Sequence, residues 1–117
     1  MMSNESLGPD VREIFEAISA GVTELARSTL GGALIEAKYD VKNFLELIKD
    51  DLVNWTGDLA SGKVSPGDFS KLVKTKQSQA EMKLLVEAGM PSARIEHFKD
   101  GVVDLICRTV ESRLTRE

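Results

Sequence analysis

The stretch that decides the fold is Ala33–Ala60, which reads ALIEAKYDVKNFLELIKDDLVNWTGDLA. Its apolar residues recur at alternating steps of three and four, and this spacing places them on one stripe of an α-helix. The stripe consists of Leu34, Ala37, Val41, Phe44, Ile48, Leu52, Trp55 and Leu59. No proline interrupts the stretch, and its only glycine, Gly57, comes near the end. We therefore predict one long helix over residues 33–60, which needs partner helices to cover its stripe.

The composition is typical of a small helical domain. The chain has 117 residues, a length that fits one domain with its own core. Apolar residues make up 42% of it, charged residues 29% and aromatic residues only 5%, and there are three prolines. This balance favours helices over a β-sandwich or barrel. We predict a disordered tail over residues 1–8 and a single helical-bundle domain over residues 9–117.

The glycine pair Gly31-Gly32 separates the predicted helix 33–60 from the one before it. The preceding helix spans residues 9–29 and opens with Pro9, a residue suited to a first turn. In one continuous rod the two apolar stripes would lie about a quarter turn apart, because each residue advances the helix by about 100°. Each glycine also costs up to about 1 kcal/mol inside a helix. We therefore expect a break or a sharp kink at Gly31-Gly32.

Two further helices follow from local start and stop signals. Ser65-Pro66-Gly67-Asp68 can form a capping box, and Gly89 stops the helix that it opens. Pro91 and Ser92 then start the last helix. The sequence thus predicts an all-α fold, an antiparallel-type bundle of four amphipathic helices over residues 9–29, 33–60, 66–88 and 92–115.

The charge and the cysteine content limit the partners and the compartment. The formal net charge is −4, which disfavours nucleic acid as a partner. The single cysteine, Cys107, can form no internal disulfide and fits a reducing compartment. The first ten residues do not resemble a signal peptide, and no apolar run is long enough to span a membrane. We expect a cytoplasmic protein with no membrane contact.

Residues able to carry catalysis are few. The only histidine, His97, shares a helical face with Asp100 and Asp104, but that face points away from the apolar stripe. One histidine cannot build a metal site of two or more histidines. Cys107 has no second cysteine or supporting histidine to activate it. We predict no catalytic residue, no metal site and no cofactor, and these residues favour a protein that is not an enzyme.

The middle of the predicted helix 66–88 is basic and rich in amides. Its lysines are Lys71, Lys74, Lys76 and Lys83, and Gln77 and Gln79 lie among them. One interpretation is that this stretch crosses the acidic part of the helix 33–60, formed by Glu46, Asp50 and Asp51, because a buried lysine needs an opposite charge. The other interpretation is a binding site for an anion or an acidic partner.

The predicted helix 33–60 also carries apolar residues away from its main stripe. These are Ile35, Tyr39, Leu47 and Val53. A helix with apolar residues on two sides is either central in a fold or shared with another subunit. We therefore predict an oligomer interface at these four residues. The expected function is protein–protein interaction by a homodimer or with another helical protein, and the alternative is a small-molecule or anion-binding bundle that uses the basic stretch.

Overall fold

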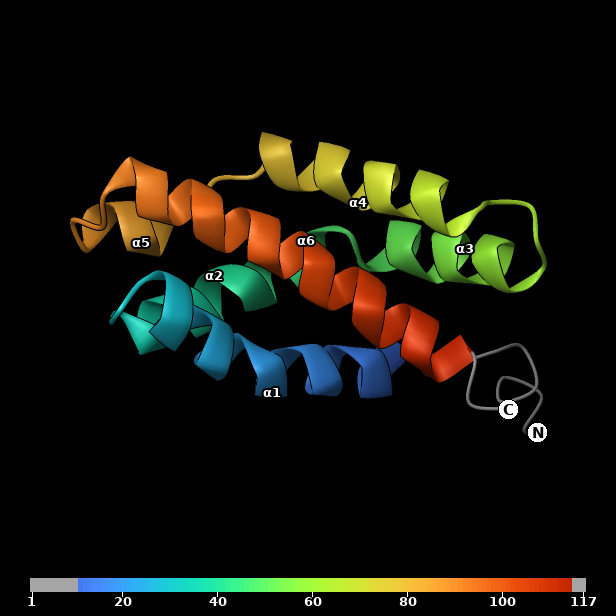
Figure 1. Ribbon diagram of the computed structural model, residues 1–117, viewed down its shortest axis with the longest axis horizontal. Coiled ribbons are helices and arrows are strands. Elements are labelled where there is room, and N and C mark those ends of the chain that lie inside the picture. Colours follow the sequence, from blue (N-terminus) through green and yellow to red (C-terminus); the bar gives the residue numbers. More distant parts are fainter. Residues whose placement is uncertain (1–10, 115–117) are drawn as a thin grey trace.

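The computed structural model describes residues 11–114, and over this range α-helices are the only regular secondary structure. The helices are α1 (Val11–Thr29), α2 (Leu34–Leu47), α3 (Lys49–Ala60), α4 (Pro66–Gln79), α5 (Lys83–Glu87) and α6 (Ser92–Leu114) (Figure 1). The predicted all-α fold is confirmed. The prediction of four helices is wrong, because the helices expected over 33–60 and 66–88 are each divided in two. The tail predicted at residues 1–8 lies outside the described residues, as do residues 9–10 and 115 of two predicted helices.

Helices α1 and α6 run antiparallel and approach each other closely. Leu105 lies against Gly21, and Leu25 lies against Gly101, so that residue numbers rise along one helix as they fall along the other. The same register joins the outer ends, where Arg113 Nη1 donates to Glu13 Oε1 at 3.3 Å. Because glycine has no Cβ, each of these two positions leaves room for the leucine side chain of the other helix.

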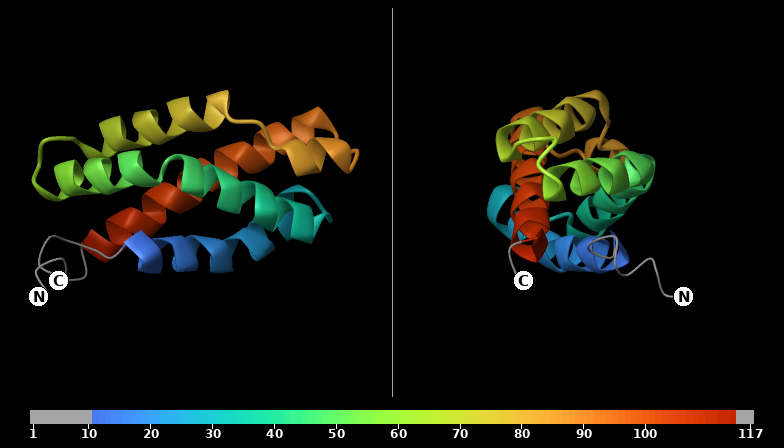
Figure 2. Two further views of the ribbon diagram at one scale, coloured as in Figure 1. Left: turned by 180° about the vertical axis from the view of Figure 1, so that it is seen from behind. Right: turned by 90° about the vertical axis from the view of Figure 1, so that its right-hand side faces the viewer.

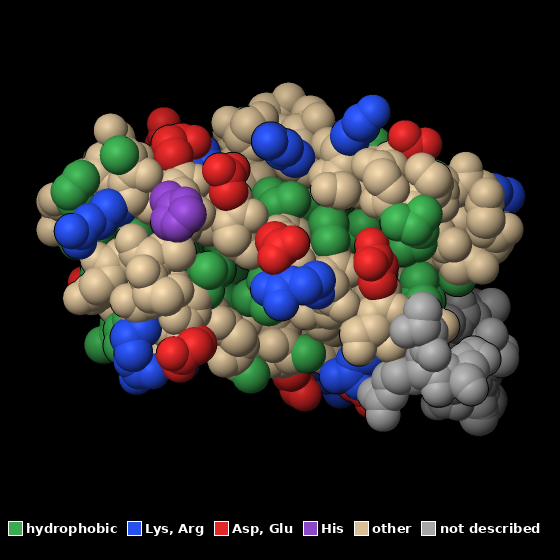
Figure 3. Space-filling view, in the orientation of Figure 1, with side chains coloured by type: hydrophobic (Ala, Val, Ile, Leu, Met, Phe, Trp, Pro, Cys, Tyr) green, Lys and Arg blue, Asp and Glu red, His purple; other side chains and the backbone are tan. Residues whose placement is uncertain are grey.

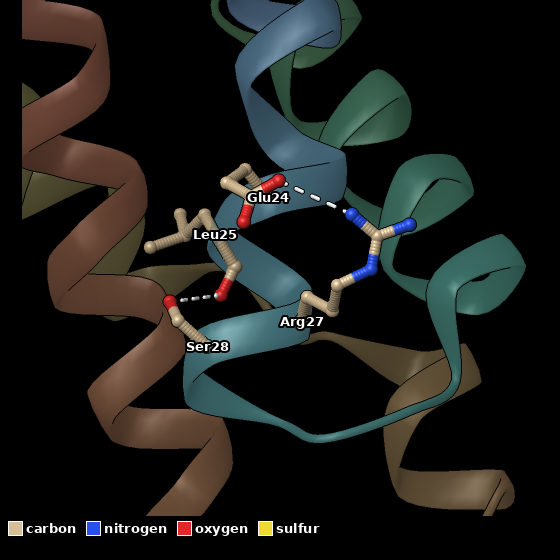
Figure 4. A network of polar contacts seen from close by, with 4 residues as sticks. All are labelled: Glu24, Leu25, Arg27 and Ser28. Atoms are coloured by element: carbon tan, nitrogen blue, oxygen red, sulfur yellow. Dashed lines mark hydrogen bonds and ion pairs between the residues drawn. The ribbon is translucent and has the colours of Figure 1, made fainter.

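The break after α1 occurs where the sequence predicts it. Gly31 has a φ of 75°, and Ala33, with a φ of 54°, precedes the first residue of α2. Arg94 Nη1 of α6 donates to the carbonyl of Leu30 at 3.0 Å and so satisfies one of the free carbonyls at the end of α1. Figure 4 shows the last turns of α1, where Arg27 pairs with Glu24 and Ser28 Oγ donates to the Leu25 carbonyl, both at 3.1 Å.

The predicted helix 33–60 is divided at Ile48. The backbone of this residue, with φ −100° and ψ 10°, departs from helical values, although Leu52 N still donates to the Ile48 carbonyl at 2.7 Å. Ile48 itself is buried, as are Phe44 before it and Leu52 after it. The turn therefore bends the chain while its apolar stripe continues to face the core. Figure 2 (left) shows α2 and α3 following one another along one side of the molecule.

The predicted helix 66–88 is divided at residues 80–82. Its start is as predicted, since Ser65 Oγ accepts from Asp68 N at 3.1 Å. At Ala80 the backbone becomes extended, with φ −93° and ψ 141°, and α5 begins after Met82. A continuous helix would turn Lys83 toward the same side as Phe69, which is buried. The break instead leaves Lys83 exposed and buries Met82.

The core lies around α6, which packs against both α1 and α4. Its fully buried residues are Phe98, Val102, Ile106 and Val110, and Phe69 of α4 is buried in the same core. The molecule extends 45 Å along its longest axis and 26 and 22 Å along the others. Helices α2 and α3 together nearly match the longest axis, since 27 residues at about 1.5 Å each span roughly 40 Å.

Candidate functional site

The outer side of α2 and α3 exposes the four apolar residues that the sequence predicts as an interface. The exposed fractions are 68% for Ile35, 54% for Tyr39, 72% for Leu47 and 46% for Val53. Among the described residues, only one other large apolar side chain, Val86 of α5, is as open to solvent. We call the surface formed by Ile35, Tyr39, Leu47 and Val53 the α2–α3 face.

The α2–α3 face exists because the opposite side of both helices is already used. Ala37, Val41 and Phe44 of α2 are buried against the rest of the protein, and Leu52 of α3 is buried as well. Ile35, Tyr39 and Val53 lie about half a helical turn from these residues and Leu47 about a quarter turn, so all four point away from the core. An apolar side chain gains nothing from this exposure within one subunit, because the hydrophobic effect rewards removal from water.

A groove of about 400 Å³ adjoins the α2–α3 face at its amino-terminal end. It lies between α1 and α2 and is lined by Ser19, Val22, Ile35, Lys38, Tyr39 and Lys42. The sequence did not predict this groove, because Ser19 and Val22 come from another helix. Its lining is apolar at Val22, Ile35 and Tyr39 and carries two cations, so it suits an apolar group with a negative charge nearby.

Charged residues separate the apolar residues of the α2–α3 face. Lys42, Glu46 and Lys49 are all exposed, and none forms an ion pair with another of residues 11–114. Unpaired exposed charges of both signs on an apolar face can pair with charges on a second molecule. The sequence analysis considered Glu46 only as a partner for the basic stretch and did not single out Lys42 or Lys49, since charged residues are expected on any exposed helix side.

The predicted basic stretch is not gathered into one cluster. Lys76 Nζ lies 3.3 Å from Asp51 Oδ2, and both side chains are about half exposed. This contact agrees with the interpretation that the stretch crosses the acidic part of residues 33–60. Lys71 and Lys74 are exposed on α4, whereas Lys83 belongs to α5, beyond the break. On the face drawn in Figure 3, basic and acidic side chains are interspersed rather than separated by sign.

The buried carboxylate of Asp40 on α2 has a structural role at the start of α5. Asp40, only 4% exposed, accepts from Leu84 N at 3.1 Å and from Leu85 N at 2.9 Å. These two N–H groups belong to the first turn of α5, whose own flanking residue, Met82, offers no side-chain cap. Asp40 therefore caps α5 from a distant part of the chain, which sequence spacing could not reveal.

The residues considered for catalysis are not arranged for it. His97 is exposed, and Asp104 pairs with Arg108 at 2.9 Å. Within residues 11–114 no group of three or more histidine, cysteine, aspartate or glutamate residues could hold a metal ion. Burial raises the pKa of the Cys107 thiol above its ordinary value of 9.0, partly offset by a hydrogen bond with Ser70, while Glu111 and Asp104 raise it further. A thiol with a raised pKa is a poor nucleophile.

None of the helices formed by residues 11–114 combines the length and the apolar character that crossing a membrane requires.

Comparison with known proteins identifies no relative of this chain. No family model matches it, and no curated protein or solved structure matches it at a significant level. The α2–α3 face is therefore defined by its exposed residues alone.

Proposed function

We propose that this chain is a non-enzymatic protein that acts through protein–protein contact, and that its α2–α3 face joins two copies into a homodimer. The observation that carries the proposal is the exposure of Ile35, Tyr39, Leu47 and Val53, which ranges from 46% to 72%. Four large apolar side chains along two consecutive helices form a surface that a second protein would remove from water. The lone thiol of Cys107 supports placing this function in a reducing compartment such as the cytoplasm.

The dimensions of the face support a specific contact. Helices α2 and α3 run for roughly 40 Å, close to the 45 Å length of the molecule. Stable interfaces bury about 800 Å² on each partner, and burial of apolar area contributes about 25 cal/mol per Å² before the costs of association. The α2–α3 face thus runs along most of the molecule, so that a partner helix can contact it over nearly its full length.

Multi-angle light scattering of the purified chain tests the proposal. We expect a mass of twice 12.8 kDa at tens of micromolar. Leu47→Glu should shift the mass toward that of the monomer while the far-ultraviolet circular dichroism stays unchanged, because the side chain is already 72% exposed. Val86→Glu is the matched control, since Val86 is 60% exposed and lies on α5 instead.

Two outcomes would contradict the homodimer. A wild-type chain that stays monomeric at tens of micromolar rules it out. A dimer that Val86→Glu disrupts and Leu47→Glu leaves intact would locate the contact away from the α2–α3 face.

The alternative function is binding of a small molecule or anion by the basic stretch of α4. Its support is that Lys71 and Lys74 are exposed and form no ion pair with another described residue. A thermal-shift panel of nucleotides, inorganic phosphate and acyl anions tests it. A ligand that raises the Tm of the wild type, but not of a Lys71→Ala/Lys74→Ala variant, would favour this function. A panel without any shift would remove it.

A further inference from the structure

Six exposed positions on α2 and α3 form a regular row that includes Ile35, Tyr39 and Val53 of the α2–α3 face, while Leu47 lies about a third of a turn to one side of it. In chain order they are Ile35, Tyr39, Lys42, Glu46, Lys49 and Val53. Their spacings are four, three, four, three and four residues, as in the heptad positions that pack lengthwise against another helix, and the turn at Ile48 lies within the row, between Glu46 and Lys49. The row lies on the side opposite the buried stripe, so it is available to a partner.

The row is complementary to itself when it is reversed. When two copies of the row lie antiparallel, the first position meets the last, the second meets the fifth and the third meets the fourth. Ile35 then faces Val53, Tyr39 faces Lys49, and Lys42 faces Glu46. An apolar residue then meets an apolar residue, an aromatic ring meets an ammonium group, and a cation meets an anion. No position in the row is left opposite a residue of like charge.

We propose that two copies of this chain pack α2 and α3 against each other in antiparallel orientation, with the two-fold axis on the exposed side of α2, midway between Lys42 and Glu46. This inference rests on the proposed function and names the partner and its register. Lys42 then pairs with Glu46 of the partner subunit, and by symmetry Glu46 pairs with Lys42 of the partner subunit, on either side of the axis. A self-complementary surface of this kind is what a two-fold symmetric dimer requires.

The charges favour the antiparallel orientation over the parallel one. A parallel pair in register would place Lys42 against Lys42 of the partner subunit, and Glu46 and Lys49 likewise against their own copies. Like charges that face each other across an interface are unfavourable, whereas the antiparallel pairing makes every central contact attractive. Charged residues at heptad positions commonly fix orientation and register in this way.

The groove between α1 and α2 fits the same arrangement. It is lined by Ile35 and Tyr39, the residues at the amino-terminal end of the row, and measures about 400 Å³. In the antiparallel pair Val53 of the partner subunit comes to Ile35 at this groove, and the contact occurs twice. Along one edge the register brings Glu36 near Asp50 of the partner subunit, and the variants below leave both residues unchanged.

Reversal of single charges tests the register with the full-length chain. Lys42→Glu creates two Glu–Glu contacts in the antiparallel dimer, and Glu46→Lys creates two Lys–Lys contacts. We expect each variant to raise the dissociation constant of the dimer at least about tenfold in sedimentation equilibrium. Lys74→Glu and Glu87→Lys change the net charge equally on exposed residues of α4 and α5, and they should have no effect.

Mixing the two single variants is the decisive measurement. In a mixed pair, Glu at position 42 of one chain faces Lys at position 46 of the other, and the second contact, between Glu46 of the first chain and Lys42 of the other, is also attractive. The mixture should therefore form a heterodimer with wild-type affinity, detected by native mass spectrometry of one isotopically labelled partner. The double variant Lys42→Glu/Glu46→Lys should restore the homodimer, which also shows that the single variants fail through charge and not through misfolding.

The possible failures are distinguishable. A wild-type monomer overturns both the proposed function and this inference. A wild-type dimer that both single variants leave intact, or whose single variants do not recover on mixing, overturns the antiparallel register alone. In a parallel dimer each single reversal exchanges one pair of like charges for another and would leave the dissociation constant nearly unchanged.

Discussion

The side chain of Leu25 occupies the space in which a Cβ atom on Gly101 would stand, with Leu25 Cδ1 2.5 Å from that position. The reverse contact joins the same two helices, because Leu105 Cδ1 lies 2.9 Å from the position of a Cβ on Gly21. These reciprocal contacts set the separation of α1 and α6. Protein interiors pack at crystal-like density, so a single added methyl group at either glycine is felt.

Substitution of Gly101 should therefore behave unlike the same substitution at an open site. We expect Gly101→Ala to lower the free energy of unfolding by about 1 kcal/mol, because overpacking outweighs the gain in helix propensity. At Gly57 of α3 a Cβ would meet nothing within 4 Å, and Gly57→Ala should raise the free energy of unfolding by up to about 1 kcal/mol. Urea denaturation of both variants checks the difference, and equal effects would contradict the close packing of α1 and α6.

Removal of the Asp40 carboxylate should destabilise α5. Asp40→Ala leaves the N–H groups of Leu84 and Leu85 without their acceptor, and we expect a loss of about 1–3 kcal/mol in the free energy of unfolding. Asp40→Asn should lose less, since one amide oxygen can still accept. Hydrogen exchange should speed up at Leu84 and Leu85 in particular. Asp100→Ala, at an exposed position of α6, is the control, and a comparable loss there would show that the cap is not the cause.

Gln77 should be replaceable by an apolar residue at no cost. It is 2% exposed, and neither its Oε1 nor its Nε2 has a hydrogen-bond partner among the described residues. Gln77→Leu should raise the free energy of unfolding by about 1–2 kcal/mol, because it removes two buried polar atoms and keeps the volume. Gln79→Leu, on the exposed side of α4, should change it by less than about 0.5 kcal/mol. A loss of stability in Gln77→Leu would show that the amide is paired in solution.

Ionisation of Cys107 should make the protein less stable at high pH. Burial raises the pKa of this thiol in the folded state, so above about pH 9 the unfolded chain loses the proton while the folded chain keeps it. The unfolded state then binds fewer protons, and the free energy of unfolding falls as pH rises. Cys107→Ala lacks this contribution. The stability difference between wild type and variant should stay constant from pH 7 to 8 and shift against the wild type above pH 9; a constant difference would refute it.

Local signals in the sequence predicted those helix ends that depend on single residues. The left-handed backbone at Gly31 and the cap that Ser65 provides for Asp68 follow from the chemistry of these residues. The turns at Ile48 and Ala80 carry no such signal, because isoleucine and alanine are compatible with a helix. They arise from tertiary packing: the chain bends at Ile48 with its stripe still buried, and it leaves the helix at Ala80 to bury Met82.

The candidate site could be predicted only as far as helical periodicity allows. Helical periodicity places Ile35, Tyr39 and Val53 nearly opposite the main stripe and Leu47 about a quarter turn from it, and all four are exposed. The groove beside Ile35 and the pairing of Lys76 with Asp51 depend on which helices become neighbours. In the sequence Asp40 is one more polar residue of an amphipathic helix. Its role as a cap depends on the N–H groups of α5, which lie more than forty residues away in the chain.

The turn at Ile48 divides the α2–α3 face between two helices that are packed to different extents. Helix α2 is held between α1 and α5, whereas α3 buries only Leu52 and Thr56 and packs more lightly on its neighbours. Segments with few buried contacts open at free energies well below that of global unfolding. Val53 and Lys49 would then belong to a helix that opens and closes on its own, and association with a second molecule would be thermodynamically linked to its closing. Binding would shift α3 toward its closed state, so the free energy needed to order this one helix would reduce the affinity of the whole face.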